Sequence, residues 1–444
     1  MNALGTRALA FEVLRSGSST PTRKVLTVAR RAELDDRDRR FLTQLVRTEV
    51  RRRGTLQALL RSFARGKPNR DLSTFLRIGL VQLLFLDGVP DHAALGETVG
   101  AAVERLGLSK GPYVNGVLRA AQRALQSGAS GDPRRDLVGR DAHFEAPVFR
   151  DPATHPFLWA EDALSIPAPL YKGWVKRFGE EEAGALARAC LEEPRISLRV
   201  VRGEREALRD ELAAADVVTI SGEHPAILVA EPDQLGALLS SAAFAEGRLT
   251  VQGEAALRAA ELCGAQEGQR WLDLCAAPGG KTAVLAGKGA EVVACDVEEA
   301  KLTRLTETLA RLGLAERVET RLLDQESSLE AESFDGVLVD APCSNTGVLA
   351  RRPDARWRFG PKSRRALTEL QDELLGRGAA CVRPGGALVY STCSIEPAEN
   401  EQRVRGFLEA QASWTLEEEL ATFPRPRGPG GSVDGGFAAR LRRG

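Results

Sequence analysis

The chain has few of the features that mark membrane and secreted proteins. Its longest apolar run, residues 75–86, contains Arg77 and Gln82 and is far shorter than the ~20 residues that a membrane span needs. Residues 1–14 have no uninterrupted apolar core, which argues against a signal peptide. Seven cysteines, an odd number without regular spacing, favour reduced thiols over a disulfide framework. We therefore expect a soluble cytoplasmic protein with no membrane segment.

The chain of 444 residues also has no net charge, since 61 Lys and Arg balance 61 Asp and Glu. This balance hides a division, because residues 1–130 hold 22 basic against 11 acidic residues and the remainder holds 39 against 50. A basic module for a polyanion fits this asymmetry, and a solvated helix face fits it as well. The basic residues cluster at Arg37, Arg39, Arg40, Arg47 and 51–53.

Three parts of the chain differ in their patterns. Apolar residues at helical spacing predict an all-α domain over 1–130, including a helix that Asp71 or Ser73 caps and that ends near Leu86. Residues 131–165 have little periodicity and are predicted as a linker. In 166–253, two predicted strands at 196–200 and 226–230 alternate with helices, which indicates a small α/β unit.

In 254–444 strands and helices alternate regularly. Alternation of this kind predicts an α/β, Rossmann-like domain, whose parallel sheet carries helices on both faces and binds ligands at the carboxyl ends of its strands. The predicted strands are 270–274, 291–295, 318–322, 336–340 and 387–391, and the main helices are 300–312, 363–382 and 399–410.

A turn of small residues follows the first of these strands and opens a helix. Its glycines let a ligand approach the backbone, and the helix start offers N–H donors to an anion. The turn is neither GxGxxG nor a P-loop. Asp296 and Asp324 end the next two strands and suit a ribose and a base, so S-adenosylmethionine fits better than a dinucleotide. The predicted cofactor residues of the turn are Cys275, Ala276, Ala277, Pro278, Gly279, Gly280 and Lys281.

Cys343 and Cys393 follow the fourth and fifth predicted strands, so adjacent strands would bring both thiols to one rim. Proximity would also permit a disulfide, which a reducing cytosol disfavours. We predict no metal site, because there is no CxxC and the four histidines lie outside this domain. The other cysteines are interpreted as small buried side chains or as lining near the cofactor: Cys190, Cys263, Cys275, Cys295 and Cys381.

A thiol beside a methyl donor suits methylation of carbon-5 of cytosine. Addition of a thiolate to carbon-6 makes carbon-5 nucleophilic, and the carbon-5 proton must leave afterwards so that the thiol is expelled. Asp340 could hold the ring nitrogen and amino group, and Lys281 could lower a thiol pKa or bind the ligand.

The motifs 273–281, 340–347, 390–394, 397–400 and 436–441 together resemble the RsmB/NOP family of RNA (cytosine-5)-methyltransferases. In the front part, 92–95 and 113–119 resemble a NusB-like RNA-binding domain, a pairing similar to the bacterial RsmB (Sun) type. The resemblance implies a class I methyltransferase fold, S-adenosyl-L-methionine as cofactor and a cytosine of 16S rRNA, free or in a small-subunit assembly intermediate, as substrate.

The same resemblance assigns roles to residues. Cys393 would be the nucleophile, Cys343 would assist product release, and Asp340 would lie between cofactor and base. Asp296 would hold the ribose and Asp324 would lie near the adenine. Two positions depart from the family pattern, Val201 in place of Asn and Gly253 in place of Asp.

Two other functions fit the sequence less well. An RNA-binding scaffold that has lost catalysis would not need both cysteines. A dehydrogenase on a Rossmann fold disagrees with the glycine pattern and leaves the cysteines unexplained. We expect a monomer.

Overall fold

The computed structural model describes residues 5–323, 329–428 and 431–444. The chain forms two compact units, Met1–Glu192 with Leu349–Phe359 and Glu193–Val348 with Gly360–Gly444. The finer division predicted from the sequence, with boundaries at 130, 165 and 253, stays a prediction. Within the described residues, no helix is both long and apolar enough to cross a membrane.

The first unit is built largely from helices, and the helices within 6–124 share an apolar core, as the periodicity predicts. Asp35 caps the longest helix by accepting a bond from the Asp38 N–H over 2.7 Å. The cap of the next helix is Asn69, which accepts from the Leu72 N–H over 2.9 Å, and not Asp71 or Ser73. The described helices are α1 (Thr6–Arg15), α2 (Pro21–Arg31), α3 (Asp36–Phe63), α4 (Arg70–Phe85), α5 (Asp91–Leu106), α6 (Gly111–Ala124), α7 (Pro156–Ala163), α8 (Ala168–Phe178) and α9 (Glu180–Ala189), with 3-10 turns η1 (Leu108–Lys110) and η5 (Pro353–Arg358).

The segment 131–165, predicted as a linker, has regular structure of its own. It contributes α7 and strand β2 (Ala142–Phe144), which pairs antiparallel with β1 (Leu125–Ser127). Asp162 in this segment is 1% exposed and accepts hydrogen bonds from Arg61 and Arg150. Arg61 lies 101 positions away from Asp162 in the sequence. The periodicity of a short segment does not reveal such a contact.

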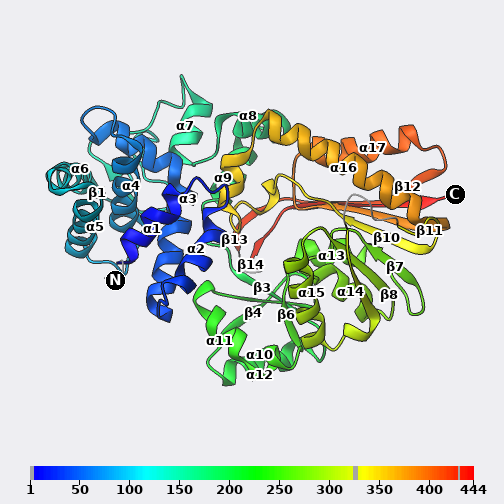
Figure 1. Ribbon diagram of the computed structural model, residues 1–444. Helices are drawn as coiled ribbons and strands as arrows, with labels where there is room; N and C mark the ends of the chain where they lie inside the picture. The colour runs from blue at the N-terminus through cyan, green and yellow to red at the C-terminus, as the bar shows by residue number, and fades with distance from the viewer. Residues whose placement is uncertain (1–4, 324–328, 429–430) are drawn as a thin grey trace. The chain divides into compact units, whose positions relative to one another are not determined.

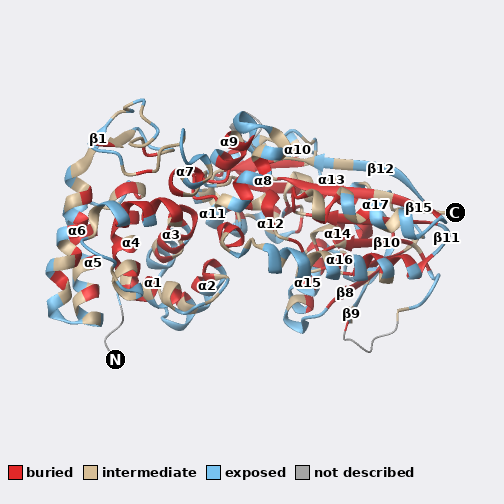
Figure 2. Ribbon diagram, turned by 90° about the horizontal axis from the view of Figure 1, so that it is seen from above, coloured by how far each residue is buried: buried red, intermediate tan, exposed pale blue. Residues whose placement is uncertain are grey.

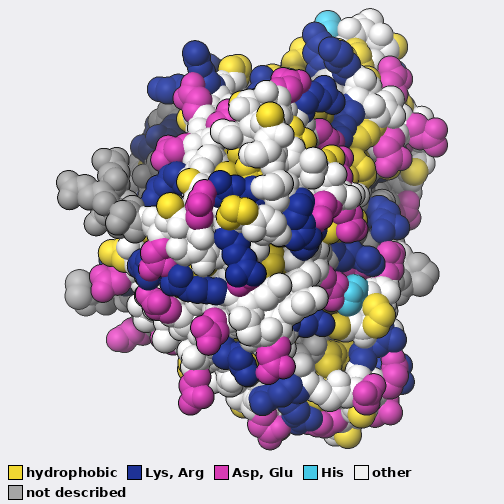
Figure 3. Space-filling model, turned by 90° about the vertical axis from the view of Figure 1, so that its right-hand side faces the viewer, with side chains coloured by type: hydrophobic (Ala, Val, Ile, Leu, Met, Phe, Trp, Pro, Cys, Tyr) yellow, Lys and Arg dark blue, Asp and Glu magenta, His cyan; other side chains and the backbone are white. Residues whose placement is uncertain are grey.

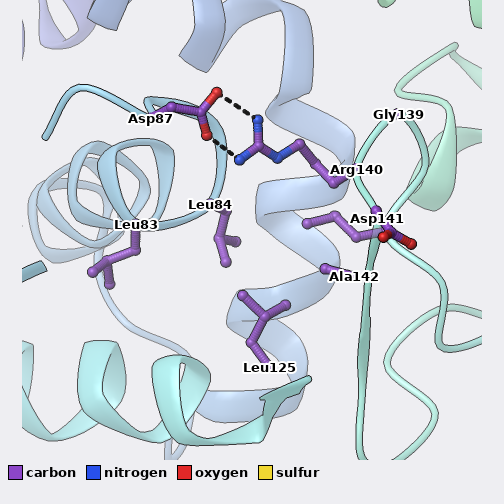
Figure 4. A pocket seen from close by; sticks show the side chains of 9 residues that line it. Leu83, Leu84, Asp87, Leu125, Gly139, Arg140, Asp141 and Ala142 are labelled. Atoms are coloured by element: carbon purple, nitrogen blue, oxygen red, sulfur yellow. Dashed lines mark hydrogen bonds and ion pairs between the residues drawn. The ribbon is translucent and has the colours of Figure 1, made fainter. Parts of the chain in front are cut away.

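A pocket of about 390 Å³ lies in the first unit between α4 and the loop before β2 (Figure 4). Leu83, Leu84 and Leu125 line its apolar side. Arg140 at its rim donates to both carboxylate oxygens of Asp87. The cation is therefore already paired within the protein.

The second unit begins with a small sheet in the order β4-β5-β3-β6, with all neighbours antiparallel. The strands predicted at 196–200 and 226–230 are present, whereas β4 and β6 were not predicted. The elements are β3 (Ile196–Val200), α10 (Arg205–Ala214), β4 (Thr219–Ser221), β5 (Ile227–Ala230), η2 (Pro232–Gln234), α11 (Leu235–Ser240), α12 (Ala242–Ala245) and β6 (Leu249–Val251).

A seven-stranded sheet follows in the order β12-β15-β11-β10-β7-β8-β9. Its strands are β7 (Arg270–Asp273), β8 (Glu291–Asp296), β9 (Val318–Leu322), β10 (Phe334–Asp340), β11 (Val382–Thr392), β12 (Trp414–Thr422) and β15 (Gly436–Arg443). The other elements are α13 (Glu254–Glu261), α14 (Gly280–Gly287), α15 (Glu299–Leu312), η3 (Ala315–Arg317), η4 (Thr346–Val348), α16 (Pro361–Cys381), η6 (Pro397–Glu399), α17 (Glu401–Ala410), β13 (Arg425–Gly428) and β14 (Gly431–Val433).

The five predicted strands, β7 to β11, form the parallel part of this sheet. The prediction of a parallel sheet is incomplete, because β15 runs antiparallel to β11 and β12 antiparallel to β15. A mixed sheet agrees with the class I methyltransferase fold that the sequence resemblance implies. Helices α16 and α17 lie on one face and α13 to α15 on the other (Figure 1). The parallel strands β7, β8, β10 and β11 are largely buried between these helices, whereas the edge strand β9 is not (Figure 2).

Candidate active site

The two thiols predicted to share a rim lie next to each other. Asp340 of β10 is in register with Ser391 of β11, and each cysteine follows its strand within a few residues. The Sγ atoms of Cys343 and Cys393 are 3.1 Å apart. Cys343 is buried and Cys393 is partly exposed, so Cys393 is the thiol that a substrate reaches more easily.

Asn345 joins the two cysteines and has a positive φ of 62°. Its Nδ2 donates to the Cys343 backbone oxygen over 2.6 Å, and its Oδ1 accepts from Cys393 Sγ over 3.3 Å. Asparagine tolerates this left-handed conformation better than most residues. The sequence analysis did not select Asn345, although it lies within one of the quoted motifs.

Lys281 and Asp340, two further predicted site residues, form an ion pair at the carboxyl end of β10. Lys281 Nζ donates to Asp340 Oδ2 over 2.7 Å, and Ser391 Oγ donates to Asp340 Oδ1 over 2.7 Å. Burial lowers the pKa of Lys281, but the charge and hydrogen bond of Asp340 outweigh this effect, so the pKa is raised. Lys281 is therefore a cation, and a Cys393 thiolate is among the charges that attract it.

The predicted cofactor turn connects β7 to α14. Ala276 N–H donates to the Cys295 backbone oxygen over 2.9 Å, and Gly279 N–H donates to the Ala276 oxygen over 2.8 Å. Gly279 has a φ of 98°, and a Cβ there would lie 3.0 Å from the Leu305 side chain. Only glycine takes this conformation without strain. The turn thus presents backbone and small side chains at the carboxyl edge of the sheet.

Asp296 ends β8 at the same edge and is 6% exposed. The Glu298 N–H and Lys301 Nζ both donate to its Oδ1 atom, each over 3.3 Å. These two long bonds leave acceptor capacity on the carboxylate for a ligand hydroxyl. Asp324, predicted near the adenine, lies outside the residues that the structure describes.

The remaining cysteines lack the surroundings of a reactive thiol. Burial raises the pKa of Cys190 to about 11 and that of Cys295 to about 12, and it raises the pKa of Cys263, Cys275 and Cys381 as well. A thiol whose pKa is raised by burial is a poor nucleophile. Among the described residues, no His, Cys, Asp and Glu side chains gather in a group of three or more that could hold a metal ion.

The two departures from the family pattern lie in the second unit. Val201 pairs through its backbone N–H with the Arg248 oxygen over 2.8 Å. A Cβ at Gly253 would lie 3.0 Å from Asp434 Oδ2, so an aspartate at this position would place a second carboxylate beside the first.

The basic residues of the front part fall into two groups. Arg37, Arg39, Arg40 and Arg47 are exposed on α3. Residues 51–53 are instead held within the first unit, because Arg52 donates to the Val138 oxygen over 2.8 Å and Arg53 forms an ion pair of 2.7 Å with Glu49. The first group is the more accessible to a polyanion, although Arg39 also forms an exposed ion pair of 2.6 Å with Asp36. On the face of the molecule in Figure 3, basic and acidic side chains are interspersed. That face therefore has no extended region of positive electrostatic potential.

A segment of the catalytic part of the sequence, Leu349–Phe359, belongs to the first unit. Trp357 Nε1 donates to the Val50 oxygen of α3 over 2.7 Å. Arg356 is fully buried. Its guanidinium donates to the backbone oxygens of Arg51, Ser165, Cys190 and Leu349. No local sequence pattern reveals these contacts, which join residues more than 150 positions apart in most cases.

Comparisons with known proteins agree with this arrangement. The family model described as "16S rRNA methyltransferase RsmB/F" matches residues 260–429, and the NusB family model matches residues 5–123. The probable ribosomal RNA small subunit methyltransferase B of Synechocystis sp. is 32% identical over 99% of this chain and 96% of its own length. The ribosomal RNA small subunit methyltransferase B of Pseudomonas putida is 36% identical over 87% of this chain and 88% of its own.

A solved structure supports the fold. The crystal structure of PH0851 covers 100% of this chain and 99% of its own, with a TM-score of 0.75 and 24% identity. Both family models and the near full-length relatives confirm the resemblance predicted from the sequence motifs. The chain belongs to the RsmB/F family of rRNA methyltransferases, with an N-terminal NusB region.

Proposed function

We propose that this enzyme methylates carbon-5 of a cytosine in 16S rRNA through a covalent adduct between Cys393 and carbon-6, with S-adenosylmethionine as the methyl donor. The observation that carries the proposal is the pair of thiols 3.1 Å apart at the carboxyl ends of β10 and β11. One thiol is enough to form the adduct. A second thiol in contact with it is explained by the later removal of the carbon-5 proton.

Cys393 is suited to the nucleophilic step by its exposure and its surroundings. Lys281 is a cation that a Cys393 thiolate attracts, so it favours the ionised form that attacks carbon-6. Asp340, fixed by Lys281 and Ser391, can accept a hydrogen bond from the amino group of the base. When S-adenosylmethionine is bound, it supplies the electrophilic methyl group that carbon-5 requires.

Cys343 is suited to the second step by its contact with Cys393 over 3.1 Å. Its pKa is raised, first by the hydrogen bond with Cys393, then by burial, and then by the charges of Cys393 and Glu399. Formation of the adduct converts Cys393 into a thioether, which carries no charge. Both contributions from Cys393 then weaken, so the pKa of Cys343 falls after the adduct has formed. Cys343 then loses its proton more readily, and its thiolate is available to accept the carbon-5 proton. Removal of the carbon-5 proton returns the electron pair to the ring and expels the Cys393 thiolate.

The residues at the carboxyl edge fit S-adenosylmethionine. The backbone of 275–281 can approach the ligand closely, and Asp296 can accept hydrogen bonds from ribose hydroxyls. The turn lacks the glycine pattern that binds the pyrophosphate of a dinucleotide. S-adenosylmethionine has a carboxylate and no pyrophosphate, so it agrees with this turn. We retain Asp324 near the adenine as a prediction.

Bisulfite sequencing of 16S rRNA tests the reaction. We expect one cytosine to be protected in the parent strain, unprotected after deletion of the gene, and protected again when the wild-type gene is restored. A restored Cys393→Ala gene should leave that cytosine unprotected. Unchanged protection of every cytosine after deletion would refute the proposed reaction.

We further propose that the exposed arginines of α3 contribute RNA affinity. Contacts of Lys and Arg with phosphates make binding salt-dependent, at roughly 0.7 log unit per phosphate for each tenfold change in salt on single strands. Removal of the whole front part is a poor test, because Trp357 and Arg356 would lose their partners in α3 and beyond. Point substitutions avoid this problem.

The test replaces four exposed arginines by glutamine and measures RNA affinity over a range of salt. We expect weaker binding and a slope that is shallower by up to about 3, with unchanged cofactor affinity. An unchanged slope would show that these arginines are only a solvated surface. The variant carries Arg37→Gln, Arg39→Gln, Arg40→Gln and Arg47→Gln, and a control of equal charge carries exposed substitutions in the second unit, Lys288→Gln, Arg304→Gln, Lys362→Gln and Arg365→Gln.

The setting of the reaction follows from this substrate. We propose that the enzyme acts in the cytoplasm on free rRNA or on a small-subunit assembly intermediate, and that it does so as a monomer. Sedimentation of the purified protein tests the last statement, since a dimer would sediment with about twice the mass.

A further inference from the structure

One buried carboxylate connects the two loops that carry the thiols. Glu399 ends η6 and is fully buried. Its Oε1 accepts from the Ser344 N–H over 2.9 Å, and its Oε2 accepts from Ser394 Oγ over 2.5 Å and from Ser344 Oγ. Ser344 follows Cys343 and Ser394 follows Cys393 in the sequence. The carboxylate therefore bonds both loops at the residue next to each thiol.

Glu399 is itself fixed from two further elements. Gln371 of α16 donates to its Oε1 over 3.3 Å and also to the Pro342 oxygen over 2.9 Å. The hydroxyl of Tyr390, a fully buried residue of β11, donates to the backbone oxygen of Glu399 over 2.6 Å. Because these bonds hold Glu399 in place, its hydrogen bonds to the two cysteine loops restrict the positions of those loops.

The burial of this charge needs an explanation. A buried carboxylate is unfavourable unless it is well hydrogen-bonded, and the donors described here are neutral: a backbone N–H, an amide and two serine hydroxyls. These four donors reach both oxygens of the carboxyl group and come from both cysteine loops and from α16. The buried carboxyl group is therefore stabilised by the same hydrogen bonds that connect the two loops.

We propose that Glu399 is a positioning residue that holds the Cys343 and Cys393 loops at the separation at which both thiols reach one base. This inference deepens the proposed function and rests on it for the roles of the two thiols. The charge of Glu399 also contributes to keeping Cys343 protonated before the adduct forms, although less than Cys393 does.

The first test measures the thiol separation without RNA. Phenylarsine oxide condenses with two thiols and releases water, and it binds tightly only when both sulfurs reach one arsenic atom. Glu399→Gln keeps the size of the side chain but removes acceptor capacity, so we expect weaker arsenical binding at the Cys343–Cys393 pair. Glu409→Gln makes the same change at an exposed position and should bind as the wild type does. Loss of binding in Cys343→Ala confirms that the pair is the site measured.

The second test measures the reaction in a single turnover with 16S rRNA. A displacement of about 1 Å costs on the order of 100-fold in rate, and we expect a loss of this size in Glu399→Gln with unchanged S-adenosylmethionine affinity. Glu399→Asp keeps the charge but is one methylene shorter. We expect it to fail as well, because it cannot reach both loops, whereas recovery by Glu399→Asp would assign the effect to charge and overturn the proposal.

Two results separate the failure of this inference from that of the proposed function. If the wild type makes no 5-methylcytosine, the proposed reaction is wrong whatever Glu399 does. If Glu399→Gln keeps the wild-type arsenical affinity and single-turnover rate, the positioning role alone is wrong. Should Glu399→Gln not fold, Ser394→Ala removes one arm of the connection and carries the same test, with unchanged arsenical affinity as the contradicting result.

Discussion

The carboxyl group of Asp273 gives a prediction about pH. Asp273 ends β7 with 1% of its surface exposed, and it accepts a hydrogen bond from Thr282 Oγ1 over 2.8 Å. Burial raises its pKa from 3.8 to about 7, against the effect of the Thr282 bond and with a further increase from the charge of Asp340. The folded protein therefore keeps this proton up to neutral pH.

The effect on stability follows from the difference in bound protons. Between the unfolded pKa of 3.8 and the folded pKa of about 7, the folded state holds one proton that the unfolded state has released. The free energy of unfolding therefore decreases as pH rises through this interval. An interval of about 3 pH units corresponds to roughly 4 kcal/mol. Above the folded pKa both states are ionised and the contribution stays constant.

The assay compares urea unfolding of the wild type and Asp273→Asn at several pH values within and above this interval. The variant has no proton to lose at this position, so its free energy of unfolding should decrease less over this interval. The decrease in the wild type should be larger by roughly 4 kcal/mol. The fluorescence of Trp271, a buried residue of the same strand, follows the unfolding. Asp233→Asn, at an exposed position, should follow the wild type. Parallel pH curves for wild type and Asp273→Asn would refute the reasoning.

Two further predictions concern the cofactor and the first unit. Asp296→Ala should weaken S-adenosylmethionine binding by roughly 1.5–3 kcal/mol for each lost charged hydrogen bond; calorimetry showing unchanged affinity would remove Asp296 from the site. Arg356→Met should destabilise the first unit by at least about 3 kcal/mol, because several buried backbone oxygens lose their donor. Urea unfolding followed by the fluorescence of Trp174 in the first unit measures this loss, and an unchanged midpoint would show that Arg356 is not needed to anchor its segment.

The sequence predicted which residues lie at the carboxyl edge of the sheet. Asp340 ends β10, and Cys343 and Cys393 follow β10 and β11, two strands whose apolar residues are clear. Parallel neighbours necessarily place such residues at one edge. The turn 275–281 was recognisable from its glycines. Gly279 has a φ of 98°, a left-handed backbone conformation that favours glycine. Local patterns of this kind depend on few distant contacts.

The two antiparallel strands were not predicted, for a physical reason. β12 contains a run of glutamates and is largely exposed, so neither alternation nor apolar residues identify it. It is held by cross-strand pairs, because Arg440 and Arg442 of β15 both donate to Glu417 over 2.7 Å. A bulge between Leu416 and Glu418 further disturbs the alternation.

The sequence analysis also missed residues whose role depends on contacts between loops. Glu399 was noted only as part of a motif, although the serine after each cysteine was a usable indication that something holds both loops. The placement of Leu349–Phe359 in the first unit depends on Arg356 and Trp357, whose partners lie far away in the chain. Residue type alone does not reveal such bonds.

The most direct test of the proposed chemistry is a denaturing gel of Cys343→Ala after incubation with S-adenosylmethionine and labelled 16S rRNA. Attack by Cys393 and methyl transfer remain possible in this variant, but release is slowed. We therefore predict a retarded band of covalently bound RNA, and no such band for Cys393→Ala or for the double variant. A band with Cys393→Ala, or none with Cys343→Ala, would contradict the roles assigned to the two thiols.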